Sequence, residues 1–137
     1  MGAVWSEAEV PDDLAIEILD QLAHPIFVKD REFRFVVLNR ALCQMVGHPR
    51  EAMLGKTDFD FFPAEQAQFF RTMDEQMFRT AQVVHVPEES LTDARGLVHV
   101  LATTKAPLKG KDGAVTHVVG IIQDITWLKL AQDALQV

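Results

Sequence analysis

Residue types that can do chemistry are present in this chain, but their spacing does not form a catalytic set. The tripeptide Gly-Lys-Thr at 55–57 is similar to the end of a phosphate-binding loop. That loop needs a glycine five residues before Gly55, where this chain has Arg50. The serines, Ser6 and Ser90, lie outside any Gly-x-Ser-x-Gly elbow. The sequence therefore predicts neither a nucleotide-binding loop nor a serine hydrolase.

The histidines and the paired glutamates do not suggest a metal site or an acid–base pair. No two histidines have the close helical spacing of zinc ligands. They are His24, His48, His85, His99 and His117. The neighbouring residues 88 and 89 are both glutamate, and neighbours on a strand point to opposite faces, so they cannot face each other. We expect structural histidines and no metal.

Composition indicates a single globular domain in a reducing compartment. The chain has 137 residues, of which 48% are hydrophobic and 24% charged. Cys43 is the single cysteine, so no internal disulfide can form. Its neighbours Leu42 and Val46 predict a buried structural thiol.

Charge and hydropathy suggest which partners to exclude. The formal net charge is -7, and lysines and arginines are scattered between acidic residues, so we expect no nucleic-acid partner. No apolar run approaches the roughly 20 residues that span a bilayer, and the first ten residues lack the features of a signal peptide. We therefore expect a cytoplasmic segment without membrane contact.

The order of predicted elements favours an α+β fold. An amphipathic helix is expected over 13–23, followed by two strands from IFVKD and FRFVVLN. Short helices should follow Asn39, Pro49 and Asp58, Gly47 should end the first of them, and a longer helix should run from Pro63 to about Thr80. Three strands come next, in VVHV, LVHVLATTKAPL and AVTHVVGIIQDIT. Grouped strands favour an antiparallel sheet with helices on one side.

That order, together with local motifs, resembles the PAS family over roughly residues 23–126. Residues 39–47 followed by GKTD at 55–58 look like the helical middle of bacterial PAS domains. Ala-Pro-Leu at 106–108 with Asp-Gly at 112–113 is similar to their penultimate hairpin. The stretch 119–126 is similar to their final strand and its terminal Asp-Ile-Thr motif.

The resemblance implies a PAS fold, a five-stranded antiparallel sheet flanked by short helices around a small cavity. It divides the chain into a flexible N-terminus (1–12), the domain with its N-terminal helix (13–126) and the start of a coiled-coil connector (127–137). We expect a sensory and signal-relay module without enzymatic activity, in a parent protein that is a sensor histidine kinase. The alternative is a ligand-free structural or dimerisation module of a cyclic-dinucleotide enzyme or transcriptional regulator.

The resemblance also allows cofactors to be tested residue by residue. Flavin-binding photosensors of this fold carry a reactive cysteine where this chain has Asp58, and a glutamine where it has Ile122. Haem-binding members use a histidine on the long helix, and residues 64–80 contain none, which leaves His85 as the substitute. Flavin and haem are therefore disfavoured, and we expect no cofactor beyond a small organic ligand.

Candidate cavity residues are mostly flexible or planar apolar side chains, which can close over a small ligand or simply form a filled core. The polar groups available to orient a ligand are His85, Thr103 and Gln123. The candidates are Phe27, Leu42, Met45, Phe62, Phe70, Met73, Met77, His85, Leu101, Thr103 and Ile122.

Two further expectations concern assembly and output. Both faces of the strand over 97–106 are largely apolar, so its outer face needs a cover. The helical stripe of Leu14, Ile18 and Leu22 can supply it within one chain or across a homodimer. At the other end, Asp124 and Thr126 should cap the helix that begins near residue 127 and relay the signal.

Overall fold

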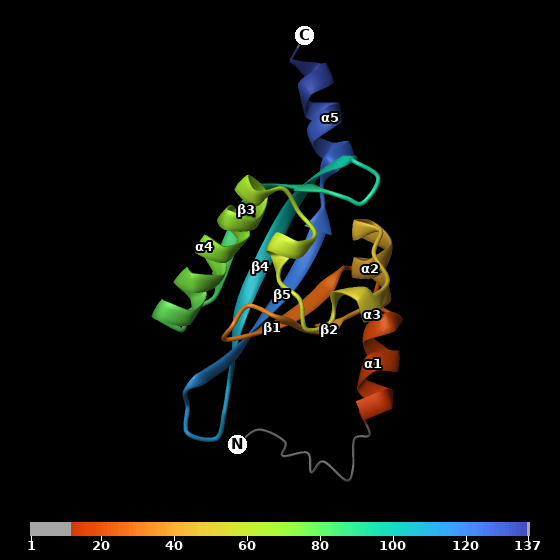
Figure 1. Ribbon diagram of the computed structural model, residues 1–137. Coiled ribbons are helices and arrows are strands. Elements are labelled where there is room, and N and C mark those ends of the chain that lie inside the picture. Colours follow the sequence, from red (N-terminus) through yellow and green to blue (C-terminus); the bar gives the residue numbers. More distant parts are fainter. Residues whose placement is uncertain (1–11, 137) are drawn as a thin grey trace.

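The computed structural model describes residues 12–136 as one sheet with helices mainly on one side (Figure 1). The helices are α1 (Asp12–Asp20), α2 (Arg40–Val46), α3 (Arg50–Met53), the 3-10 helix η1 (Asp58–Asp60), α4 (Ala64–Thr80) and α5 (Thr126–Leu135). The strands are β1 (Ile26–Asp30), β2 (Phe35–Leu38), β3 (Val84–Thr92), β4 (Val98–Lys109) and β5 (Val115–Asp124). The flexible N-terminus expected over residues 1–12 lies outside the described residues, apart from Asp12 at the start of α1.

The sheet confirms the predicted fold class. Its strand order is β2-β1-β5-β4-β3, and every neighbouring pair is antiparallel. In Figure 1, α2, α3 and α4 lie on one side of the sheet, while α5 extends away from it. Within residues 12–136, no helix combines the length and apolar character needed to cross a membrane.

Asn39 holds the N-terminal half of the domain together, as its predicted capping position suggests. Its side-chain oxygen accepts hydrogen bonds from the N–H groups of Leu42 (3.1 Å) and Ile26 (2.9 Å). Its amide group donates to the carbonyls of Leu19 (3.0 Å) and His24 (2.9 Å). A fully buried amide with four partners therefore joins α1, β1 and α2. The predicted stop at residue 47 is also present, since this glycine has a φ of +80°.

Three element boundaries differ from the sequence-based expectation. The first helix ends at Asp20 and not at residue 23. Strand β3 continues to Thr92, because a bulge between Val86 and Glu89 accommodates Pro87, which cannot donate a ladder hydrogen bond. Asp58 does not cap η1; residue 57 occupies that position, and Asp58 is buried.

Among residues 12–136, apolar side chains on the outer face of the sheet and along the first helix remain exposed. Val98 on β4 is 55% exposed, and Ile121 on β5 is 46% exposed. The α1 stripe does not cover them: Leu14, Ile18 and Leu22 are 45%, 54% and 44% exposed. Cover supplied within one chain is therefore excluded for the described residues, and cover across two chains stays a prediction.

Candidate sensory cavity and output junction

A small cavity lies between the sheet and the helices. Its volume is about 30 Å³, which holds water but not an organic ring, since a dry cavity that binds benzene is about 150 Å³. Most of its wall is apolar, and four charged or ionisable side chains complete it. The lining residues are Phe27, Lys29, Phe35, Leu42, Val46, Asp58, Phe62, Phe70, Glu89, Leu91, Leu101, Lys105 and Ile122.

Most of the charged part of the wall belongs to a buried ionic cluster that joins four elements, β1, η1, α4 and β4. Lys29 of β1 donates to Asp58 (2.5 Å) and to Asp74 of α4 (2.8 Å). Lys105 of β4 donates to the other oxygen of Asp74 (2.6 Å). All four side chains are at most 6% exposed, so each charge depends on its partners and not on water.

The pairing favours the charged forms of Lys29 and Asp74 in spite of burial. Burial by itself lowers the pKa of Lys29, but the charges of Asp58 and Asp74 outweigh it and the net shift is upward. Burial raises the pKa of Asp74, but Lys29 and Lys105 outweigh it and the net shift is downward. Asp74 is thus the carboxylate shared by two ammonium groups.

Glu89 is a polar group of the wall with one carboxylate oxygen that lacks a partner among the described residues. Its Oε1 accepts a hydrogen bond from the Thr103 hydroxyl at 2.7 Å. Its Oε2 is buried and has no hydrogen-bond partner among the described residues. Burial raises the pKa of Glu89 by more than the charge of Lys105 and the hydrogen bond of Thr103 lower it.

The predicted cavity residues divide into groups. Phe27, Leu42, Phe62, Phe70, Leu101 and Ile122 line the cavity. Met45 packs against the same core from the side, and Thr103 is buried beside Glu89. Three candidates lie elsewhere. Met73 and Met77 of α4 pack in a second hydrophobic cluster with Val84 and Val86 of β3, near the connection from α4 to β3. His85 is exposed and contacts the Thr104 hydroxyl (3.2 Å) on the outer face of the sheet.

Sequence reasoning missed the charged wall, although the sequence carried signals for it. Lys29 alternates with apolar neighbours at an inward position of β1, and Asp74 lies four residues after Phe70 and three before Met77 on the buried face of α4. A lysine at a core position of a strand and an aspartate at a core position of a helix together indicate a buried ion pair.

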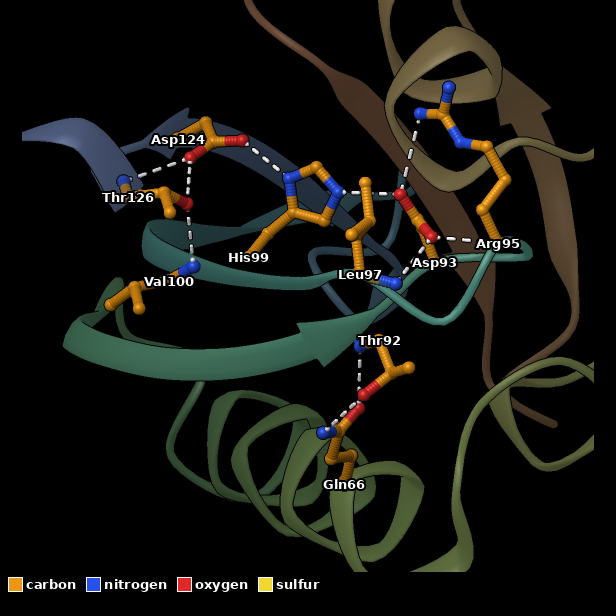
Figure 2. A network of polar contacts seen from close by, with 9 residues as sticks. All are labelled: Gln66, Thr92, Asp93, Arg95, Leu97, His99, Val100, Asp124 and Thr126. Carbon is orange, nitrogen blue, oxygen red and sulfur yellow. Dashed lines mark hydrogen bonds and ion pairs between the residues drawn. The ribbon is translucent and has the colours of Figure 1, made fainter.

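A second polar network lies where β5 passes into α5 (Figure 2). Asp124 Oδ1 accepts from the N–H (3.0 Å) and the hydroxyl (2.5 Å) of Thr126, which begins α5. The Thr126 hydroxyl accepts from Val100 N–H (2.9 Å), and Val100 C=O accepts from Ile125 N–H (2.8 Å). Asp124 and Thr126 thus join the start of α5 to the first residues of β4.

His99 connects this junction to the turn between β3 and β4. Its Nδ1 lies 2.7 Å from Asp124 Oδ2, and its Nε2 lies 2.9 Å from Asp93 Oδ2 (Figure 2). Since carboxylates only accept, both ring nitrogens must carry a proton to make both hydrogen bonds. Partial burial lowers the pKa of His99, but the hydrogen bonds to Asp93 and Asp124 outweigh it and raise the pKa overall. The sequence analysis did not single out His99 from the other histidines.

Apart from the hydrogen bonds at its first residue, α5 packs little against the rest of the domain. No described side chain of α5 is buried, and Trp127 is 72% exposed. One further contact is the ion pair of Lys129 with Glu88 of the β3 bulge (3.0 Å), where both side chains are partly exposed.

Comparison with known proteins agrees with this architecture. A family model for the PAS fold matches residues 19–129. The uncharacterised protein y4lL of Sinorhizobium fredii is 38% identical over 87% of this chain. A diguanylate cyclase of Vibrio cholerae is 30% identical over 80%, and the methanogenesis regulatory histidine kinase FilI of Methanothrix harundinacea is 33% identical over 83%. The chain spans only 14%, 34% and 13% of these proteins.

A solved structure corrects the expectation about nucleic acid. Vibrio cholerae VqmA, solved as a complex with ligand and DNA, has a TM-score of 0.71 and 27% identity over 81% of this chain and 50% of its own. The exclusion of nucleic-acid partners from net charge is therefore wrong. The net charge of one domain does not indicate the charge of the other domains in a longer protein. A longer protein that contains an acidic domain can therefore still bind DNA.

The comparisons leave cofactor content open. A LOV protein of Rhodobacter sphaeroides has a TM-score of 0.68 and 16% identity, over 80% of this chain and 64% of its own. At that identity the likeness shows a shared fold alone, and the expected lack of flavin and haem stays a prediction. Among residues 12–136, no group of three or more His, Cys, Asp or Glu side chains is placed to hold a metal ion.

Proposed function

Because this chain belongs to the PAS fold family of sensory modules, we propose that it is the sensory and signal-relay domain of a longer cytoplasmic signalling protein, and that a small organic ligand in its cavity changes the anchoring of α5. One observation carries the proposal: consecutive residues of β4 serve the two sites. Leu101 lines the cavity, and Val100 bonds the root of α5 through both its N–H and its C=O. A displacement of β4 at the cavity therefore acts directly on the junction.

The parent protein that we propose is a sensor histidine kinase of a two-component system. The relationship to the FilI kinase supports this choice, and the relationship to a diguanylate cyclase supports the alternative of a cyclic-dinucleotide enzyme. The ligand-free dimerisation module remains the second candidate function, favoured by the cavity of only about 30 Å³. A native mass spectrum of freshly purified protein separates the two functions: retained organic mass favours sensing, and bare protein favours the ligand-free module.

In the full-length protein, Asp124→Ala is expected to change basal output or the response to ligand while the domain stays folded. The N-cap position of α5 is Ile125, so Asp124 is not the cap that the sequence predicts; its carboxylate accepts from the N–H and the hydroxyl of Thr126. Loss of a carboxylate contact at a helix start costs about 0.5–2 kcal/mol, which is comparable to the roughly 1–3 kcal/mol by which one site biases another. The measurement is output activity with and without ligand. A matched control is Asp112→Ala, which removes a similar turn contact, to the N–H of Ala114, in the β4–β5 hairpin. Output equal to wild type in a folded variant would show that the contacts of Asp124 with Thr126 are only structural.

We also propose that Leu14, Ile18 and Leu22 form a dimerisation surface, because Leu14 and Ile18 are exposed one turn apart on α1 and Leu22 is exposed just after its end. Ile18→Glu places a charge in the middle of that surface and is expected to shift the domain toward monomer in sedimentation. Asp13→Lys, which changes the charge at an exposed position on another side of the helix from Ile18, is the control and should leave association as in wild type. Equal association of both variants would count against α1 as the interface.

A further inference from the structure

Glu89 lines the cavity and has one carboxylate oxygen without a hydrogen-bond partner among the described residues. The residue is 7% exposed, it lines the cavity, and Thr103 occupies its Oε1. The other oxygen, Oε2, is buried without a partner among the described residues. Because a buried polar atom without a partner costs free energy, an occupant that donates a hydrogen bond to Oε2 gains affinity at this point.

Lys105 supplies donors on the same face of the sheet. Thr103 and Lys105 are two residues apart on β4, so their side chains point to the same face, and Thr103 bonds Glu89 across the β3–β4 pair. The Lys105 ammonium has three N–H groups and donates one to Asp74. Lys105 also lines the cavity, which therefore offers an acceptor and a donor on one wall.

The charges around these two groups exclude a charged occupant. Lys105 would repel a buried cation, and Glu89 would repel a buried anion. Lys29 and Asp58, the other charged residues of the wall, are already paired with each other. The ligand that fits is neutral, with its polar atoms on one edge.

The rest of the wall favours a flat ligand. Four aromatic rings line the cavity, from β1, β2, the loop before α4 and α4 itself, namely Phe27, Phe35, Phe62 and Phe70. Aromatic walls of this kind bury planar apolar rings well.

We propose that this cavity recognises a small, neutral, planar molecule with an amide-like edge, whose N–H or O–H donates to Glu89 and whose adjacent carbonyl-type oxygen accepts from Lys105. This inference rests on the proposed sensory function and names the ligand chemistry. Because the cavity of about 30 Å³ is too small for a ring, the walls must separate on binding. The bulge that carries Glu89 inward carries Glu88 outward to Lys129 of α5, so binding acts on a segment in contact with the output helix.

The test compares two probe compounds on the folded domain. The compound 2-pyridone has a ring N–H beside a carbonyl, whereas N-methyl-2-pyridone keeps the carbonyl and lacks the donor. Chemical-shift changes of the Leu101 and Ile122 methyl groups report binding, since both residues line the cavity. We expect 2-pyridone to bind roughly tenfold or more tightly than its N-methyl derivative, as for one hydrogen bond to a charged group.

Two matched variants assign the difference to Glu89. Glu89→Gln keeps an oxygen for Thr103 and replaces the acceptor with an amide group, so its affinity for 2-pyridone should fall to that of the N-methyl compound. Glu88→Gln makes the same change on the exposed neighbour and should leave affinity unchanged. Equal binding of both compounds, equal binding by Glu89→Gln and wild type, or no binding at millimolar concentration overturns the ligand assignment. The sensory function itself is judged separately, by the output of Asp124→Ala.

Discussion

Replacing Asp74 with alanine should lower the free energy of unfolding by about 3–5 kcal/mol, the usual cost of breaking a buried ion pair from one side. Asp74 is fully buried and is the shared partner of Lys29 and Lys105. Without it, Lys105 loses the carboxylate that it contacts, and Lys29 keeps only Asp58. Two ammonium groups cannot be rehydrated inside the core, so the variant is left with uncompensated charge.

Urea unfolding of wild type and Asp74→Ala measures this loss as a shift of the midpoint. Glu75→Ala is the matched control, because it removes the exposed carboxylate at the next position of α4. We expect the control to stay within about 0.5 kcal/mol of wild type, as surface substitutions usually do. Equal stability of the two variants would contradict the ionic cluster as described.

The fold was predictable where the deciding signals are local. Asn39 and Gly47 mark the two ends of α2 by capping and by a left-handed φ, and both act as the sequence indicates. The grouping of strands before and after the helices gave the antiparallel sheet. The length of β3 was not predictable in this way, because Pro87 suggests a break in the strand, and only the bulge explains how pairing resumes after it.

The site was predictable only in its apolar part. Alternation along strands placed Phe27, Leu101 and Ile122 on the cavity face. The charged wall depends on contacts between distant residues: Lys29 lies 29 positions from Asp58 and 45 from Asp74. Periodicity marks Lys29 and Asp74 as inward-facing, but sequence spacing alone does not reveal which residue, so far along the chain, is the partner of each.

The bridge made by His99 predicts a specific dependence of stability on pH. His99 contacts Asp124 at the end of β5 and Asp93 in the turn before β4, and Arg95 also pairs with Asp93 (3.4 Å). The hydrogen bond from His99 lowers the pKa of Asp93. For Asp124, burial raises the pKa, but Thr126 and His99 outweigh it and the net shift is downward.

The sign of each contribution follows from these directions. Since the pKa of folded His99 is raised, its stabilising effect is fully present below the unfolded pKa of about 6.5 and is lost as the pH rises through the folded value. Since the pKa values of Asp93 and Asp124 are lowered, their effects are present above about pH 4 and are lost as the pH falls through the folded values. The network therefore stabilises the domain most between about pH 4 and 6.5.

We expect His99→Gln to lower the melting temperature clearly at about pH 6 and only slightly at about pH 9. At the higher pH the wild-type imidazole is neutral, so it carries no charge and donates to only one of the two carboxylates, and the substitution removes less. The difference at the lower pH should correspond to about 1 kcal/mol or more, the usual net value of a hydrogen bond to a charged group that is partly exposed. His117→Gln is the control, because His117 contacts the Thr116 hydroxyl and not a carboxylate. Its effect on the melting temperature should lack this pH dependence.

Hydrogen exchange at the first turn of α5 should accelerate in His99→Gln as well, because Asp124 then loses the partner that fixes it to β4. A melting difference independent of pH, with unchanged exchange in α5, would mean that the protonation of His99 does not contribute to stability and that His99 takes no part in holding the output helix.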